Sequence, residues 1–481
     1  MNTSFKSSIF HKKLKYLFSA APQVSLLDKN GDCLYLKYEK ISDLNSLTKP
    51  AKMCQQIFPV KLGDIYLTND PQTGGALHSD FIFITPFSLN DKDIDGFLCL
   101  QQSFKPKVLN MDTSIQEVFK VPPMPVAQNL KLQNEILESM QAHPDCPQDF
   151  LKHVSAKVEK LEQYLNKIKA LFEKSDFSER FLKNYQLECK KQFVTCMESI
   201  PVGEFQETLK LSDKSEIKLK LSIEEDLIVY DFNGTTEGKK LFLTESMAES
   251  ACYASSLALV NSSLPVTESV LSVSQILIPK SSLLSANAQQ FTFWGCTQGT
   301  QWISNLCLKT INQIFKRHKK PSVTAVSGAS TVIDLEFQNK KHYYQNLSSG
   351  APATPNNKGE TGVNIWFKSH LEESIEQSEQ LYPIKIKSFS QRPNSAGDGA
   401  NTGGLGITQV IKVLEDARLS WGFLSDKPKG ADGGKDAQNS DVILMLPNGE
   451  RQKLEYIGYA SCPAQSQVVI HSPGGGGFGD L

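Results

Sequence analysis

The densest group of polar side chains in the sequence lies between two apolar segments near residue 70. The stretch GDIYLTNDPQTGGALHSDFIFI contains Asp64, Asn69, Asp70, His78 and Asp80, and the Asn-Asp-Pro sequence and two glycines at its centre favour a turn. Carboxylates and an imidazole held together in a loop are what a divalent metal or a general base requires. The alternative is structural: Asn69 and Asp70 cap a turn, and His78 lies on the surface.

Strands on both sides must position this polar loop, which we define as residues 63–80. Four segments rich in β-branched and aromatic residues are bounded by Gly, Asp, Asn or Pro, namely residues 32–38, 63–70, 80–87 and 96–102. This composition is typical of strands. We therefore expect a β-rich N-terminal part over residues 1–125.

From about residue 130 to 200 the apolar period changes to that of helices, and Pro147 stands near the start of the first one. The apolar stripe of the first helix is Phe150, Val154, Val158, Leu161, Leu165, Ile168 and Phe172. A second helix is expected from about Asp176, with the stripe Phe181, Tyr185, Cys189, Phe193 and Cys196. Two amphipathic helices in series predict an antiparallel helical hairpin over residues 126–202. A coiled-coil partner is the alternative.

Residues 203–347 combine strands with one helix. Alternating apolar residues over Ile217–Ile223 predict a strand that turns at residues 224–226 and resumes. A helix is expected at residues 298–318, with the apolar stripe Trp302, Leu306, Ile311 and Phe315. The basic KRHKK sequence at its end complements a helix C-terminus, which we favour over a nucleic-acid patch.

Glycine dominates the last part of the chain, residues 348–481. The final 85 residues hold 16 of the 30 glycines, clustered at residues 395–406, at residues 429–436 and in the terminal PGGGGFGD. Each glycine fixed in a fold costs roughly 0.5–1 kcal/mol more than alanine. Apolar strands lie between the clusters, so we expect a folded unit in which backbone segments approach closely. The overall prediction is an α+β composite.

Composition excludes several classes of protein. The net charge is -1, the charged fraction is 21%, and only 5 of the 51 basic residues are arginines, so neither nucleic acid nor an anionic membrane is an expected partner. The ten cysteines form no CxxC motif, which favours reduced thiols in a cytoplasmic protein. The N-terminus lacks the apolar segment of a signal peptide, and no segment approaches 18 consecutive apolar residues.

The sequence contains none of the common nucleotide or hydrolase motifs. GxxxxGK[ST], a GxGxxG that opens a helix, HExxH and GxSxG are all absent. The terminal GGGGFGD is followed by no helix that could lend its dipole to a phosphate. ATP, if used, is therefore expected to enter through a partner.

Two of these stretches together resemble a known family. GDIYLTNDPQTGGALHSD resembles the GD-x-x-x-TNDP-x-x-GG-x-H-L-P-D signature of the hydantoinase B/5-oxoprolinase family, and PGGGGFGD resembles its closing motif. Five further motifs follow in the family's order: QEVFKVPPM (116–124), IVYDFNGT (228–235), EQSEQLYP (376–383), RPNSAGDGANTGGLG (392–406) and GADGG (430–434). The resemblance covers nearly the whole chain.

The resemblance implies a B-type subunit of the N-methylhydantoinase or 5-oxoprolinase kind, related to subunits of acetone carboxylase. In such enzymes an A-type subunit uses ATP to activate a small cyclic amide, and the B-type part completes ring opening. Carried over by motif, the implied catalytic residues are Asn69, Asp70, Asp80, Glu117 and Ser395. Asp80 and His78 are the implied ligands of a divalent metal.

The chain also departs from the family pattern. Leu77 stands at the histidine of the signature and His78 lies one place later, which on an extended segment turns a side chain to the opposite face. Ser103-Phe104-Lys105-Pro106 replaces a His-His-x-Asp sequence, Lys358 replaces an aspartate, and Thr402 replaces an arginine. The chain keeps the glycines of the family pattern but lacks several of its ionisable side chains. The alternative function is therefore a catalytically degenerate binding or regulatory protein.

Overall fold

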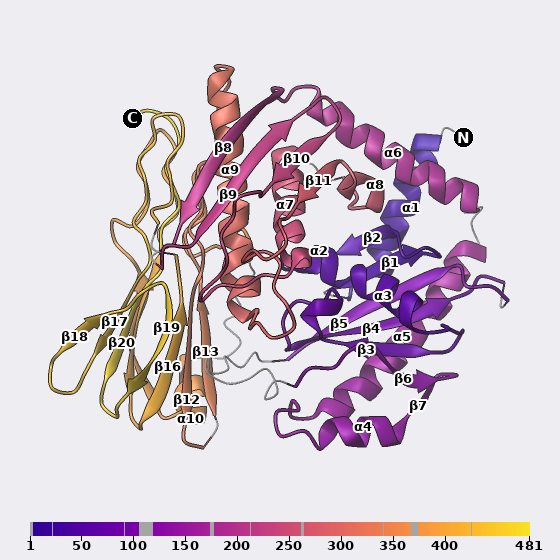
Figure 1. Ribbon diagram of the computed structural model, residues 1–481, viewed down its shortest axis with the longest axis horizontal. Coiled ribbons are helices and arrows are strands. Elements are labelled where there is room, and N and C mark those ends of the chain that lie inside the picture. The colour runs from indigo at the N-terminus through magenta and orange to yellow at the C-terminus, as the bar shows by residue number, and fades with distance from the viewer. Residues whose placement is uncertain are drawn as a thin grey trace.

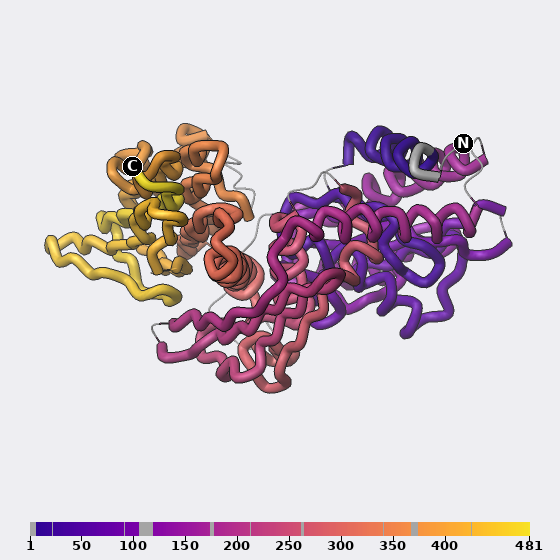
Figure 2. Tube along the Cα trace, turned by 90° about the horizontal axis from the view of Figure 1, so that it is seen from above, coloured from indigo at the N-terminus to yellow at the C-terminus, as the bar shows by residue number. Residues whose placement is uncertain are grey.

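The computed structural model describes residues 3–21, 23–90, 92–104, 119–173, 178–211, 213–260, 264–339, 341–366, 374–424 and 426–481. It is an α+β structure with four sheets, and all but one of the strand pairs are antiparallel among these residues. Figures 1 and 2 show the N-terminal sheet at one end of an elongated molecule and the C-terminal sheets at the other.

The N-terminal sheet carries the polar loop. Its strand order is β2-β1-β5-β4-β3-β6-β7. The strands are β1 (Val24–Asp28), β2 (Cys33–Lys37), β3 (Ile65–Thr68), β4 (Asp80–Phe87), β5 (Gly96–Ser103), β6 (Met124–Gln128) and β7 (Lys131–Leu132). Strands β2 to β5 confirm the four strand predictions. The helices α1 (Thr3–Leu17), α2 (Asp43–Ser46) and α3 (Lys49–Ile57) accompany this sheet.

The two long helices form where the sequence predicted them, but the expected hairpin is wrong. After α4 (Asn134–Gln141), α5 (Phe150–Glu173) lies against β4 and β5, whereas α6 (Glu179–Met197) packs against α1 and α8 (Glu268–Leu271). The apolar stripes of α5 and α6 pack against different elements of the core, so the two helices do not pack along each other. Within α6, Met197 is buried and Cys196 is exposed, because four residues after Phe193 continue the same face.

The second sheet has the order β11-β10-β9-β8 and two buried helices beside it. Its strands are β8 (Gly203–Lys210), β9 (Glu216–Ile223), β10 (Ile228–Asp231) and β11 (Ser274–Leu277). β9 and β10 form the expected antiparallel pair. Helix α7 (Glu245–Val260) packs against α9 (Thr300–Arg317), which follows a π-helical turn, η3 (Gly295–Gly299), and confirms the helix predicted at 298–318.

The last two sheets pack on each other. One has the order β13-β12-β16-β19 and the other β14-β15-β20-β17-β18. Their elements are β12 (Thr331–Phe337), β13 (His342–Leu347), α10 (Ile375–Leu381), β14 (Ile384–Gln391), β15 (Ile407–Val413), β16 (Ala417–Gly422), β17 (Asp441–Met445), β18 (Arg451–Lys453), β19 (Ile457–Cys462) and β20 (Gln467–His471). Side chains such as Leu335, Ile411 and Ile470 form one buried cluster between the sheets.

The glycine tail is folded, as expected. Gly474 to Gly477 are buried, and the Gly475 N–H donates to the Gly404 carbonyl at 2.9 Å. A Cβ on Gly475 would lie 1.8 Å from the Ala351 carbonyl oxygen. The tail therefore runs among the other glycine-rich loops at distances that no side chain permits.

Candidate functional site

Turn chemistry shapes the polar loop between β3 and β4. A short 3-10 turn, η1 (Pro71–Thr73), follows Asp70, whose side chain accepts a hydrogen bond from the Gln72 N–H at 3.0 Å. Gly74 ends this turn with φ of +98°, a conformation that favours glycine. The structural interpretation of Asp70 as a turn cap is thus confirmed.

Hydrogen bonds of Asn69 link the polar loop to the segment that precedes β6. Its buried amide donates to the carbonyl oxygens of His78 at 2.6 Å and Phe119 at 2.8 Å. Its Oδ1 accepts from the Val121 N–H at 2.6 Å. All three bonds go to backbone groups, so this side chain acts as a structural bridge in the present arrangement.

Asp80 lies at the start of β4 and is buried against a lysine. Its Oδ2 and Oδ1 lie 2.8 and 3.0 Å from Nζ of Lys40. The exposed fractions of the two side chains are 1% for Asp80 and 10% for Lys40. Burial lowers the pKa of Lys40, but the carboxylates of Asp80 and Asp43 together outweigh burial and raise the pKa above its ordinary value. Lys40 is therefore charged at neutral pH.

His78 faces a small hollow together with Asp70, Gln72 and Lys120. Burial, and secondarily the charge of Lys120, lowers the pKa of His78 to about 4. The imidazole is consequently neutral at pH 7. Nζ of Lys120 lies 3.8 Å from Oδ1 of Asp70. The small hollow has a volume of about 10 Å³, which is close to what one water molecule requires.

A larger hollow also borders the η1 turn and has a volume of about 390 Å³. Its lining comes from the η1 turn, α3, the start of α7 and the segment before η3: Lys49, Met53, Pro71, Gln72, Thr73, Gly74, Thr244, Glu245, Ser246, Ser285 and Ala286. Lys49 forms an ion pair with Glu249 of α7. Pro71 and Gln72 line both hollows, so a water-sized cavity and a ligand-sized one adjoin at the signature turn.

The predicted site residues come together only in part. Asn69, Asp70, His78 and Asp80 share the polar loop, whereas Glu117 lies outside the described residues. Ser395 belongs to the C-terminal loops: its Oγ donates to the Arg392 carbonyl at 2.7 Å and accepts from the Gly406 N–H at 2.9 Å. Its observed contacts shape those loops.

The residues present do not fit the implied metal. Both oxygens of Asp80 bind Lys40, and His78 lines a hollow with Asp70 instead. Across the described ranges no group of three or more His, Cys, Asp or Glu side chains has an arrangement that would hold a metal ion. The sequence did not point to Lys40, which is 40 positions from Asp80 in an otherwise ordinary segment.

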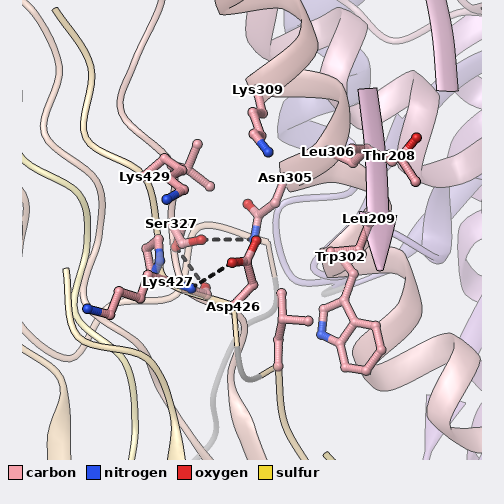
Figure 3. Close-up of a pocket in the computed structure, with 14 residues that line it drawn as sticks. Thr208, Leu209, Trp302, Asn305, Leu306, Lys309, Ser327, Asp426, Lys427 and Lys429 are labelled. Carbon is pink, nitrogen blue, oxygen red and sulfur yellow. Dashed lines mark hydrogen bonds between the residues drawn. The ribbon is translucent and has the colours of Figure 1, made fainter. Parts of the chain in front are cut away.

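A third hollow, of about 40 Å³, lies where α9 and β8 face Leu424 and residues 426–429 (Figure 3). Asn305 donates to the Ser327 carbonyl at 2.9 Å, and Nζ of Lys309 lies 3.4 Å from Oε1 of Glu207. None of the polar-loop residues lines this hollow. We therefore place the candidate site at the two hollows beside the signature turn.

Comparison with known proteins agrees with the signature. The family model for hydantoinase B/oxoprolinase matches residues 22–481. The chain belongs to the hydantoinase B/oxoprolinase family. A 5-oxoprolinase from Saccharomyces cerevisiae is 25% identical over 87% of this chain and 36% of the yeast protein. The first relatives found are likewise longer proteins, of which this chain spans about a third or less.

Two solved structures are similar to this chain in fold. An ATP-dependent caprolactamase from Pseudomonas jessenii gives a TM-score of 0.80 at 16% identity and covers 99% of this chain and 90% of its own. Nucleotide-free acetone carboxylase gives a TM-score of 0.80 at 12% identity, over 98% of this chain and 74% of its own. None of the helices in the described residues is both long and apolar enough to span a membrane.

Proposed function

We propose that this chain is the B-type component of an ATP-dependent enzyme that opens small cyclic amides, with an A-type partner that uses the ATP. The observation that carries this proposal is the hollow of about 390 Å³ bounded by the family's signature turn. Relatives named for 5-oxoprolinase and caprolactamase activity make a ring amide the expected ligand class.

The lining of the larger hollow suits a polar ring. The hydroxyls of Thr73 and Ser285 donate to the carbonyls of Asp70 and Pro279 at 3.0 and 3.1 Å, so they can only accept from an amide N–H. The Thr244 hydroxyl accepts from the Met247 N–H and can donate to an amide carbonyl. The ammonium of Lys49 is already compensated by Glu249. The hollow thus offers hydrogen bonds to a lactam or ureide, and Glu245 adds one exposed carboxylate to its lining.

In the proposed reaction Asp70 is the general base. An unactivated amide carbonyl is a poor electrophile, so activation by the A-type partner precedes the step on this chain. A water in the small hollow loses its proton to Asp70 and attacks the activated carbonyl carbon of a ring held where the two hollows adjoin at Pro71 and Gln72. The ring C–N bond then breaks, and the leaving nitrogen takes the proton that Asp70 accepted from the water.

Reconstitution with an A-type subunit from the same organism tests this proposal. We expect ATP hydrolysis to rise with at least one of 5-oxoproline, hydantoin and caprolactam only when both subunits are present. Asp70→Asn should lower ring opening about 10²–10⁴-fold, the usual contribution of a general base. Ring opening that is unchanged in this variant would remove Asp70 from the mechanism.

A second candidate function is binding or regulation without turnover. The specific observation in its favour is that Asn69 and Asp80 are both saturated by internal contacts. Calorimetric titration with the same three amides separates the candidates. Binding of an amide or of the A-type subunit, with no ring opening in the reconstituted pair, favours the second one.

A further inference from the structure

A buried ammonium group lies at the carboxylate that the family signature preserves. Asp80 keeps its place in the signature, and its two oxygens are 2.8 and 3.0 Å from Nζ of Lys40. Lys40 lies just before α2, and its side chain reaches the first residue of β4. The contact joins two elements of the N-terminal part and shields both charges from water.

A second carboxylate lies beside this pair. Asp43 is fully buried, and its Oδ2 accepts from the backbone N–H groups of Glu39 and Lys40 at 3.0 and 2.9 Å. Its Oδ1 is buried without a hydrogen-bond partner. The charges of Asp43 and Asp80 interact with each other and with Lys40. Two buried carboxylates around one positive charge form the kind of environment that a divalent cation commonly fills.

The surroundings add a soft donor. Cys296, in the π-helical turn η3, is buried near Asp80 and Lys40, whose charges act on its thiol. Thiolate, carboxylate and imidazole groups are the usual ligands of zinc. In the described structure, however, no three of these carboxylate and thiol groups are arranged to hold a metal ion, and the oxygens of Asp80 contact Nζ of Lys40 instead.

We infer that the ammonium group of Lys40 replaces a divalent cation at Asp80, so that this chain needs no metal there. A metal ligated by the same oxygens would lie about 2.0–2.6 Å from them. It would therefore come close to Nζ of Lys40 and be repelled by its charge. The inference concerns metal content and stability, so it stands or falls independently of the proposed reaction.

Metal analysis of the wild-type protein is the first test. The protein is incubated with Mn²⁺, Zn²⁺ or Mg²⁺, dialysed, and measured by inductively coupled plasma mass spectrometry. We expect far less than one metal ion per chain, and a melting temperature that is unchanged by EDTA. One bound ion per chain that disappears in Asp80→Asn would overturn the inference.

Removal of the ammonium is the second test. In Lys40→Ala, two buried carboxylates lack their counter-charge, so we expect a lower melting temperature that Mn²⁺ or Zn²⁺ raises again. The double variant Lys40→Ala/Asp80→Asn should show no such recovery. Lys120→Ala removes a more exposed lysine from Asp70 and is the matched control that should not gain metal dependence.

The outcomes remain decisive if Lys40→Ala folds poorly. Soluble protein obtained only when metal is present during refolding would support the inference. Folded Lys40→Ala that neither binds nor responds to metal would overturn it. If the variant is insoluble under every condition, the wild-type metal content decides.

Discussion

Asn69 and Val121 exchange two hydrogen bonds across the edge of the polar loop. The Asn69 N–H donates to the Val121 carbonyl at 3.1 Å, and the Val121 N–H donates to Oδ1 of Asn69 at 2.6 Å. The backbone N–H and the side-chain oxygen of Asn69 thus pair with the backbone of Val121, much as a neighbouring strand would. This contact holds the signature turn against the segment that leads into β6.

Asn69→Ala should destabilise the protein by about 3 kcal/mol, because it leaves several buried backbone groups without partners. Urea unfolding followed by circular dichroism measures this change. Asn448→Ala is the matched control: Asn448 accepts only from the Glu450 N–H in an exposed turn, so less than about 0.5 kcal/mol is expected. Equal effects of the two variants would contradict the structural role of Asn69.

The pKa of about 4 for His78 predicts a pH-dependent stability. An unfolded histidine titrates near 6.5, so between pH 6.5 and 4 the unfolded chain binds more protons at this position. The stability from His78 is therefore complete above pH 6.5 and is lost as pH falls through this window. We expect a loss of about 1–2 kcal/mol, reduced from the full shift because the ring is partly exposed.

His78→Gln should remove this part of the pH dependence. Melting temperatures between pH 4 and 8 would converge for the variant and the wild type at low pH and separate above pH 6.5. His318→Gln, at an exposed histidine after α9, should keep the wild-type profile. If both variants keep the wild-type profile, His78 does not contribute to it.

Gly475→Ala should destabilise the C-terminal part by about 3 kcal/mol or more. Its Cβ would lie 1.8 Å from the Ala351 carbonyl oxygen, and neither backbone segment can retreat without breaking its hydrogen bonds. Gly449 has φ of +87° and no neighbour within 4 Å of a built Cβ. Gly449→Ala therefore measures the backbone conformational cost alone, about 1 kcal/mol. Similar melting temperatures of the two variants would argue against close packing of the tail.

Glu245→Trp should block the larger hollow. Glu245 is exposed in the first turn of α7 and lines the hollow, so an indole there would occupy ligand space without entering the core. We expect at least a tenfold weaker binding of whichever cyclic amide the wild type binds, measured by calorimetry. Glu135→Trp makes the same change in the first turn of α4 and should leave binding intact. Equal affinities of both variants would move the ligand site elsewhere.

Local patterns identified much of the fold and part of the site. The strands β2 to β5 lie where residue composition predicted them, and the helices α5, α6 and α9 lie where apolar periodicity predicted them. The signature turn also formed around Asp70 and Gly74 as its residue types required. In contrast, periodicity did not show whether α5 and α6 would pack on each other, because an apolar stripe identifies a buried face but not its partner.

By itself, the sequence determined the family, the polar loop and the need for glycine in the tail, because these depend on residue types at short spacing. Only the tertiary structure decided which charged side chains lie in contact. Lys40 reaches Asp80 because the chain between them folds α2, α3 and β3 into the same N-terminal part. Electrostatic energy depends on distance in space rather than along the chain, so a lysine 40 positions away can neutralise a signature carboxylate.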